Sequence, residues 1–86
     1  MYRATFVPRV EHDLKQLGRS VRLRILRKIK WLAENLESLS LETLAGQWRG
    51  MYKLHVGDYR VIYTLNSACE LLIVHATGHR SKVYTT

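Results

Sequence analysis

The sequence predicts an α+β fold, in which a small antiparallel or mixed β-sheet carries two N-terminal helices on one face in the order β-α-α-β-β-β-β. Two observations support this prediction: helical periods in the first half of the chain, and alternating apolar and polar residues around a Gly57-Asp58 turn in the second half. With both helices on one face, the other face of the sheet stays open. The 86 residues suffice for one compact unit, so residues 1–86 are expected to form a single domain.

The first half of the chain contains one expected strand and two expected helices. The strand spans residues 2–6 and ends before Pro8, which suits the first turn of a helix. The first helix is expected to end at Gly18 in the left-handed conformation, and Ser20 is expected to cap the second helix. The apolar positions of the two helices follow the helical period, and they are Val10, Leu14 and Leu17, then Val21, Ile25, Ile29, Leu32 and Leu36.

The second half predicts a loop followed by strands. Residues 38–47 are rich in serine and leucine and are expected to form the loop. Strands are then expected near residues 50–56, 59–65 and 70–76, with a short tail strand near residues 82–85. Such a run of strands after a helical pair implies that the strands share one sheet.

The Gly57-Asp58 turn predicts the register of a β-hairpin. The pairs expected on one face of the hairpin are Val56 with Tyr59, Leu54 with Val61, and Tyr52 with Tyr63. The residues expected on the other face are Lys53, His55, Arg60 and Ile62. His55 then lies directly across from Arg60. Like charges so placed need exposure to water or an anionic ligand, for which phosphate is the natural candidate.

The overall charge narrows the class of partner. A net charge of +7 and a pI of about 10.0 indicate nucleic acid, an acidic protein or an anionic surface. Cys69 is the single cysteine, which rules out an internal disulfide framework. The polar N-terminus and the lack of a long apolar run argue against a signal peptide or a membrane span. Together these features favour a reduced, cytoplasmic setting without a membrane.

Three segments of the chain carry a resemblance to a known family, namely residues 44–46, 52–63 and 78–84. Their pattern resembles the RelE/ParE toxin superfamily, and specifically its RelE-like ribonuclease branch. The resemblance spans nearly the whole chain. It implies a small sheet with two helices on one side, and a toxin of a type II toxin–antitoxin pair that enters the ribosomal A site and cuts mRNA.

The resemblance also implies five site residues. A lysine on the strand before the hairpin turn matches Lys53, and the second basic position, which is usually lysine in the RelE-like branch, holds His55. An arginine after the turn matches Arg60. The arginine after the glycine of the next loop matches Arg80, and the tyrosine near the C-terminus matches Tyr84.

The reaction implied by the resemblance requires neither a metal nor a cofactor. The 2′-hydroxyl attacks the neighbouring phosphorus and the 5′-oxygen leaves, so the protein must stabilise an additional negative charge. Lys53 is expected to hold the phosphate, while Arg60 and Arg80 clamp its non-bridging oxygens. His55 is the expected base, because histidine changes charge near neutral pH. Tyr84 is expected to stack on or orient a base.

Several other residues have simpler explanations. His75 and His79 are four residues apart, but an expected strand and Gly78 between them argue against a metal site. Trp31 and Trp48 are expected to be packing residues.

The second helix is basic on its polar side. A solvated surface explains this pattern, and so does contact with ribosomal RNA or with an acidic antitoxin; an interfacial membrane helix would look similar. The basic residues are Arg22, Arg24, Arg27, Lys28 and Lys30.

Three classes of function remain open on sequence alone. A ribosome-dependent endoribonuclease is favoured by the basic and aromatic set of residues. A ParE-like inhibitor of DNA gyrase shares the fold but acts by binding a protein and does not need this set. A non-catalytic nucleic-acid-binding module would need only the charge. The expected partners are mRNA, the ribosome and a cognate antitoxin that forms a hetero-oligomer with the toxin.

Overall fold

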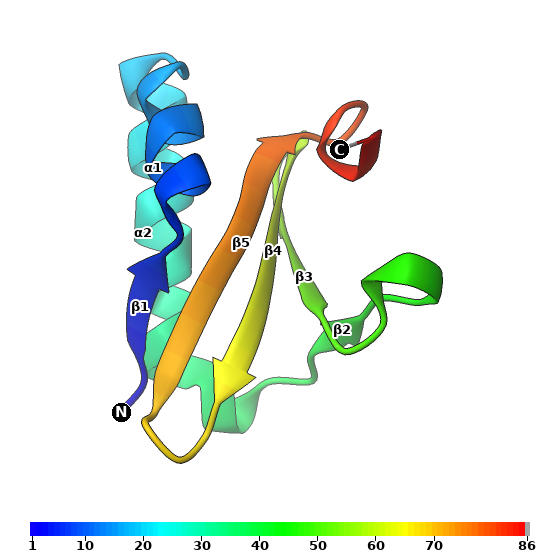
Figure 1. The fold of residues 1–86 in the computed structure, drawn as a ribbon. Helices are drawn as coiled ribbons and strands as arrows, with labels where there is room; N and C mark the ends of the chain where they lie inside the picture. Colours follow the sequence, from blue (N-terminus) through cyan, green and yellow to red (C-terminus); the bar gives the residue numbers. More distant parts are fainter. Residues whose placement is uncertain (86) are drawn as a thin grey trace.

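A computed structural model describes residues 1–85 of the chain, which form two helices and a five-stranded sheet (Figure 1). The helices and strands are β1 (Arg3–Phe6), α1 (Pro8–Lys15), α2 (Arg19–Asn35), β2 (Glu42–Thr43), β3 (Tyr52–Val56), β4 (Tyr59–Asn66) and β5 (Leu71–His79). Short 3-10 helices occur at Leu36–Ser38, Gly46–Trp48 and Val83–Thr85. The predicted α+β class is therefore confirmed.

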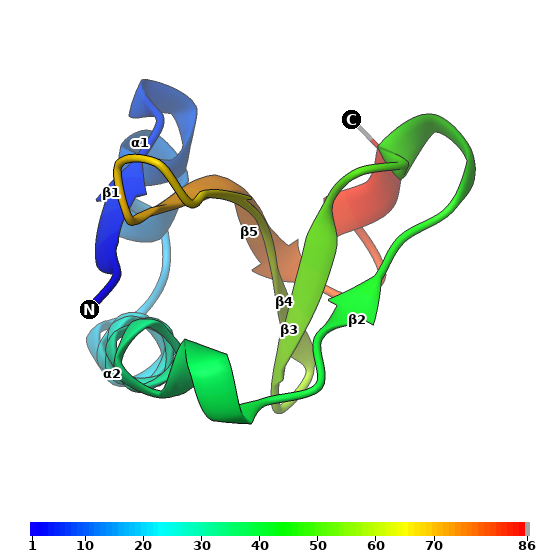
Figure 2. The same ribbon diagram turned by 90° about the horizontal axis from the view of Figure 1, so that it is seen from below.

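The sheet is mixed, and its spatial order is β1-β5-β4-β3-β2. β1 pairs in parallel with β5, whereas the other neighbours are antiparallel. A parallel pair needs a long crossover connection, and here the two helices and the three intervening strands provide it. Both helices lie on the same side of the sheet, as the two views show (Figures 1 and 2).

The start of α2 differs from the prediction. Gly18, not Ser20, is the N-cap residue, and its carbonyl accepts the backbone N–H of Arg22 at 3.0 Å. Gly18 has a φ of −59° and is not left-handed. α1 ends earlier because the N–H groups of Gln16 and Leu17 bond to carbonyls three residues back, which tightens the last turn without a glycine.

The main core lies between the helices and the sheet. α2 contributes Ile25, Ile29 and Leu32, each at most 2% exposed. The largest buried side chains of the strands in this core are Val61, Tyr63, Leu72 and Val74. Burying these apolar surfaces supplies most of the driving force that holds α2 against the sheet.

The opposite face of the sheet, called here the distal face, is covered in part by a second apolar cluster. Its buried members are Ile62, Ala76 and Val83, and the partly buried side chains packed on them are Leu44, Trp48, Met51 and Tyr84. The segments 46–48 and 83–85 lie on this side of the sheet, away from the helices (Figure 2). The distal face is therefore less open than the sequence predicts.

Two elements on the distal side correct the predicted strand list. Residues 83–85 form a 3-10 helix, not a tail strand, because the turn after β5 (Lys82 N–H to His79 C=O, 2.8 Å) directs Val83 back onto the sheet. The predicted loop 38–47 contains β2, which pairs Glu42 with Lys53 and Thr43 with Tyr52. Four strands do follow the helices, as the sequence predicts, but β2 takes the place of the expected tail strand.

In the part of the chain that the structure describes, no helix is both long and apolar enough to cross a membrane.

Candidate functional site

The β3–β4 hairpin has the register that the sequence predicts. Tyr52 pairs with Tyr63, Leu54 with Val61, Val56 with Tyr59, and His55 with Arg60. Gly57 has a φ of +60°, and a positive φ at the first turn residue alone matches a type II′ turn, whose twist suits a hairpin.

Lys53 and His55 lie on the distal face of β3, and Arg60 lies beside His55 on β4. Lys53 is half-buried and His55 is exposed. Ile62, the partner of Lys53 on β4, belongs to the second apolar cluster. The three cationic positions therefore border an apolar surface that also includes Tyr84.

Glu42 of β2 lies next to this group and was not predicted as a site residue. Its Oε2 atom is 3.5 Å from Nε2 of His55 and 3.7 Å from Nζ of Lys53. The carboxylate thus lies beside the two side chains that are expected to contact a phosphate. β2 has only two residues, and a strand this short shows no alternation of apolar and polar residues. The sequence therefore carries no signal that Glu42 lies beside His55 and Lys53.

The guanidinium group of Arg60 points to the tip of its own hairpin. Its Nη1 atom donates to the carbonyls of Gly57 and Tyr59, at 2.8 Å each. An arginine has five N–H donors, so others stay available for an oxygen ligand. In the structure Arg60 therefore both shapes the turn and carries charge.

Arg80 also reaches the hairpin tip, but through its backbone. Its N–H donates to the carbonyl of Asp58 at 2.8 Å, and its side chain is exposed. Within residues 1–85 the Arg80 guanidinium forms no hydrogen bond or ion pair. Arg60 and Arg80 thus come together at residues 57–58, although they lie 20 positions apart in the chain.

Tyr84 lies on the distal face and packs in the second apolar cluster. Its ring centre is 6.3 Å from that of Trp48, with the two planes 75° apart, which is an edge-to-face contact. The predicted packing role of Trp48 is confirmed. Tyr84 remains partly exposed, so its ring is accessible from solvent.

His75 and His79 do not form a pair. Nε2 of His75 is 2.7 Å from the Thr64 hydroxyl, whereas Nδ1 of His79 accepts from the backbone N–H of Ser81 at 3.2 Å. Within residues 1–85, no group of three or more His, Cys, Asp or Glu side chains is placed to hold a metal ion.

The negative charge of Glu42 also affects a residue on the helix side of the sheet, since it helps to raise the pKa of Tyr63. Burial raises the pKa of Tyr63 to about 12, and the nearby Tyr52 and Glu42 add to this effect. Tyr52 stacks on Tyr63 with ring centres 5.5 Å apart. Tyr52 and Tyr63 therefore anchor the hairpin in the main core on the helix side of the sheet.

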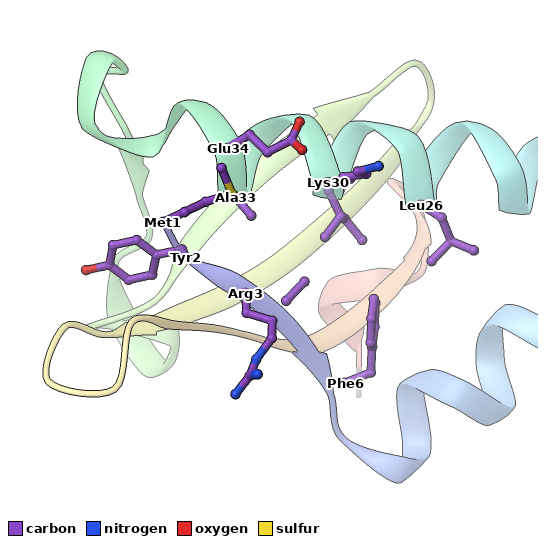
Figure 3. A pocket seen from close by; sticks show the side chains of 10 residues that line it. Met1, Tyr2, Arg3, Phe6, Leu26, Lys30, Ala33 and Glu34 are labelled. Atoms are coloured by element: carbon purple, nitrogen blue, oxygen red, sulfur yellow. The ribbon is translucent and has the colours of Figure 1, made fainter.

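An apolar groove of about 380 Å³ lies between β1 and α2 (Figure 3). Phe6, Leu26 and Ala33 line it, and Lys30 and Glu34 stand at its α2 side. β1 forms the opposite edge of the sheet from β2 and β3, so this groove is separate from the cationic positions.

Comparison with solved structures shows the same fold in three toxins. The TM-score is 0.81 to a chain of the toxin–antitoxin complex RelBE2 from Mycobacterium tuberculosis, at 18% identity over 92% of this chain and 98% of the other. It is 0.76 to the isolated RelE toxin of E. coli, at 22% identity over 99% of this chain and 93% of the other. It is 0.71 to a chain of the archaeal RelE–RelB complex from Pyrococcus horikoshii, at 25% identity over 95% and 98% of the two chains.

Comparison with protein families gives a match over most of the chain. The matching family is described as the ParE toxin of the type II toxin–antitoxin system parDE, and the match spans residues 5–84. A search of curated protein sequences finds no match. The superfamily that the sequence resembles is thereby confirmed: the chain belongs to the ParE toxin family of type II toxin–antitoxin systems, within the RelE/ParE superfamily.

Proposed function

We propose that this toxin is a ribosome-dependent endoribonuclease that cuts mRNA in the ribosomal A site and thereby inhibits translation in the cytoplasm. The observation that supports the proposal is the placement of Lys53, His55 and Arg60 together on the distal face, with Arg80 at the adjoining hairpin tip. A cluster of fixed positive charges beside a group that can move a proton suits phosphodiester cleavage. A cognate antitoxin, bound in a hetero-oligomer, is the proposed partner that restrains it.

The reaction assigns a separate task to each residue. His55 accepts the proton of the 2′-hydroxyl as its oxygen attacks the phosphorus, the bond to the 5′-oxygen breaks, the departing 5′-oxygen takes up a proton from water, and a 2′,3′-cyclic phosphate forms. Lys53 and the free N–H groups of Arg60 and Arg80 bind the non-bridging oxygens, on which charge develops. Tyr84 provides a ring for stacking on a base.

Glu42 gives this mechanism an additional feature. Its carboxylate lies within 3.7 Å of both Lys53 and His55, where a phosphate of the substrate must bind. Binding of RNA therefore replaces the Glu42 carboxylate with a phosphate beside Lys53 and the His55 ring. The Glu42 side chain is 59% exposed, so its ion pair with the half-buried Lys53 is partly solvated and contributes little stability, and the exchange costs little.

Inhibition of DNA gyrase is the second candidate, because the family that matches the chain is that of ParE toxins. A gyrase inhibitor acts by binding a protein and does not require a proton acceptor beside a phosphate site. The two candidates therefore differ in their dependence on His55 and Lys53.

A translation reaction with purified toxin, followed by mapping of mRNA ends, tests the proposal. Lys53→Gln is expected to lower cleavage about 10²-fold, because it removes a charge from the transition state. Lys30→Gln is the control, since it removes the same charge from the far side of α2. His55→Lys places a fixed positive charge at this position and removes a side chain that can accept a proton near neutral pH, so RNA binding is expected to persist while the pH profile of cleavage changes.

A supercoiling assay with DNA gyrase runs in parallel. Intact mRNA together with inhibited supercoiling would reject the ribonuclease and establish the second candidate. Superimposable pH profiles for wild type and His55→Lys would remove the proton-transfer role from His55 while leaving it as a charge contact.

A further inference from the structure

α2 carries a basic stripe that the proposed site does not use, defined here as Arg24, Arg27, Lys28 and Trp31. These positions are spaced by three or four residues, so they share one face of the helix. In residues 1–85, the structure pairs none of the three cations with a carboxylate. The stripe is therefore an uncompensated band of positive charge.

Trp31 is the unusual member of the stripe. The sequence predicts a packing residue, but the side chain is 41% exposed, and Met1 is the only other large exposed apolar residue of the described chain. Nζ of Lys28 lies 4.0 Å from the centre of the indole ring, a cation–π contact. An exposed aromatic ring among cations is the combination that binds single-stranded nucleic acid, because bases stack on the ring while phosphates pair with the cations.

The stripe is continuous with the proposed site. One groove, of about 350 Å³, is lined by Arg24, Arg27, Lys28, Trp31 and Val56. A second groove, of about 240 Å³, shares Lys28 and Trp31 with the first and extends to Glu42, Lys53 and His55. A chain of nucleotides that leaves the site thus has a path around the edge of β3 to α2.

Arg24 joins the stripe to the hairpin tip. A Cβ atom added to Gly57 would collide with the Arg24 guanidinium, so this group lies directly against the turn. Arg60 contacts the same turn through the Gly57 carbonyl. Arginines of α2 and β4 therefore both contact the Gly57 turn, which brings the positive charge of the stripe to the hairpin tip.

We propose that the basic stripe of α2 is a second binding site for single-stranded RNA, in which Trp31 stacks on a base and Arg24, Arg27 and Lys28 bind the neighbouring phosphates. This proposal rests on the proposed function in one respect: the strand bound there is the continuation of the strand held at Lys53 and His55. An acidic protein segment is the alternative occupant, and the experiment separates the two.

The test measures binding of a short oligouridylate with 2′-O-methyl sugars, which cannot be cut because it lacks a free 2′-hydroxyl. In a Trp48→Phe background, Trp31 is the single tryptophan, and its fluorescence is expected to be quenched by stacking. Trp31→Leu is expected to weaken binding about tenfold, and Trp31→Tyr to recover much of the loss, since a ring is restored.

Salt dependence identifies the phosphate contacts. Arg27→Gln is expected to lower the slope of log Kd against log salt concentration by about 0.7, the value for one phosphate contact with a single strand. Lys30→Gln is the matched control, because Lys30 lies on the same helix but lines the separate groove beside β1 (Figure 3). Its slope is expected to equal that of wild type.

Equal effects of Arg27→Gln and Lys30→Gln, without quenching of Trp31, would overturn the proposal. Quenching by a polyglutamate peptide but not by the oligouridylate would instead assign the stripe to an acidic protein. Because the oligonucleotide cannot be cleaved, these outcomes do not depend on whether the toxin cuts mRNA.

Discussion

At the scale of single residues, Glu42 changes the interpretation of the distal face. Because His55 and Arg60 lie opposite each other, they are expected to need either water or an anion beside them. The structure provides both, since His55 is exposed and the Glu42 carboxylate lies 3.5 Å from its ring. In the toxin alone, the Glu42 carboxylate therefore occupies the position beside Lys53 and His55 where an anionic ligand is expected.

Glu42→Gln tests whether this anion competes with RNA. The substitution keeps the size of the side chain and removes its charge, so the KM for RNA is expected to fall a few-fold, in line with the small energy of an exposed ion pair, while kcat is unchanged. Glu34→Gln removes an equal charge from α2, outside the site, and serves as the control. A tenfold fall in kcat would show that Glu42 takes part in the reaction itself.

At the scale of elements, the β3–β4 hairpin is the part of the site that sequence alone could predict. Its register depends on a two-residue turn and on alternation within 15 residues, both of which are local. The Val83–Thr85 segment could not be predicted, because burial of Val83 against Ile62 and Ala76, not local alternation, decides its path. The position of the Arg60 guanidinium was also not predictable, since register places a backbone and leaves a long side chain free to turn.

Gly57→Ala tests the hairpin turn. A side chain at this position must adopt a φ of +60°, which non-glycine residues rarely do, and the flexible Arg24 guanidinium must move aside, so the free energy of unfolding is expected to fall by about 1 kcal/mol. Urea denaturation followed by circular dichroism measures the change. Gly78→Ala is the control, because φ there lies outside the left-handed region and the added carbon would make only ordinary contacts, at 3.7 Å or more, with Val83. Equal stability of the two variants would contradict this view of the turn.

At the scale of the whole molecule, the two faces of the sheet differ in structure and in proposed role. The helix side buries the main core, which includes Tyr63 at 1% exposure, while the distal side carries the candidate site and a smaller apolar cluster. The fold class and the one-sided placement of the helices followed from sequence periodicity, because that periodicity records which face is buried. The parallel pairing of β1 with β5 could not be predicted in this way, because no local sequence pattern indicates which distant strands become neighbours.

Tyr63 links the stability of the whole fold to alkaline pH. Its pKa is raised from 10.0 to about 12 in the folded protein, so this contribution to stability is fully present below pH 10 and is lost as pH rises through 12. A shift of this size corresponds to roughly 3 kcal/mol. In Tyr63→Phe the unfolding free energy is expected to decline less steeply between about pH 9 and pH 12 than in wild type. Parallel declines, measured by urea denaturation at several pH values, would rule out Tyr63 as the titrating group.

The pairing of the first strand with the last also has a consequence for the order in which the protein is made. Residues 3–6 leave the ribosome long before their partners, residues 71–74, so β1 has no neighbour in the sheet until β5 has been synthesised. Pairing over such a long separation also slows folding. A nascent chain therefore cannot complete its sheet before residue 74 has been added. Any activity that needs the folded sheet begins only after that point of translation.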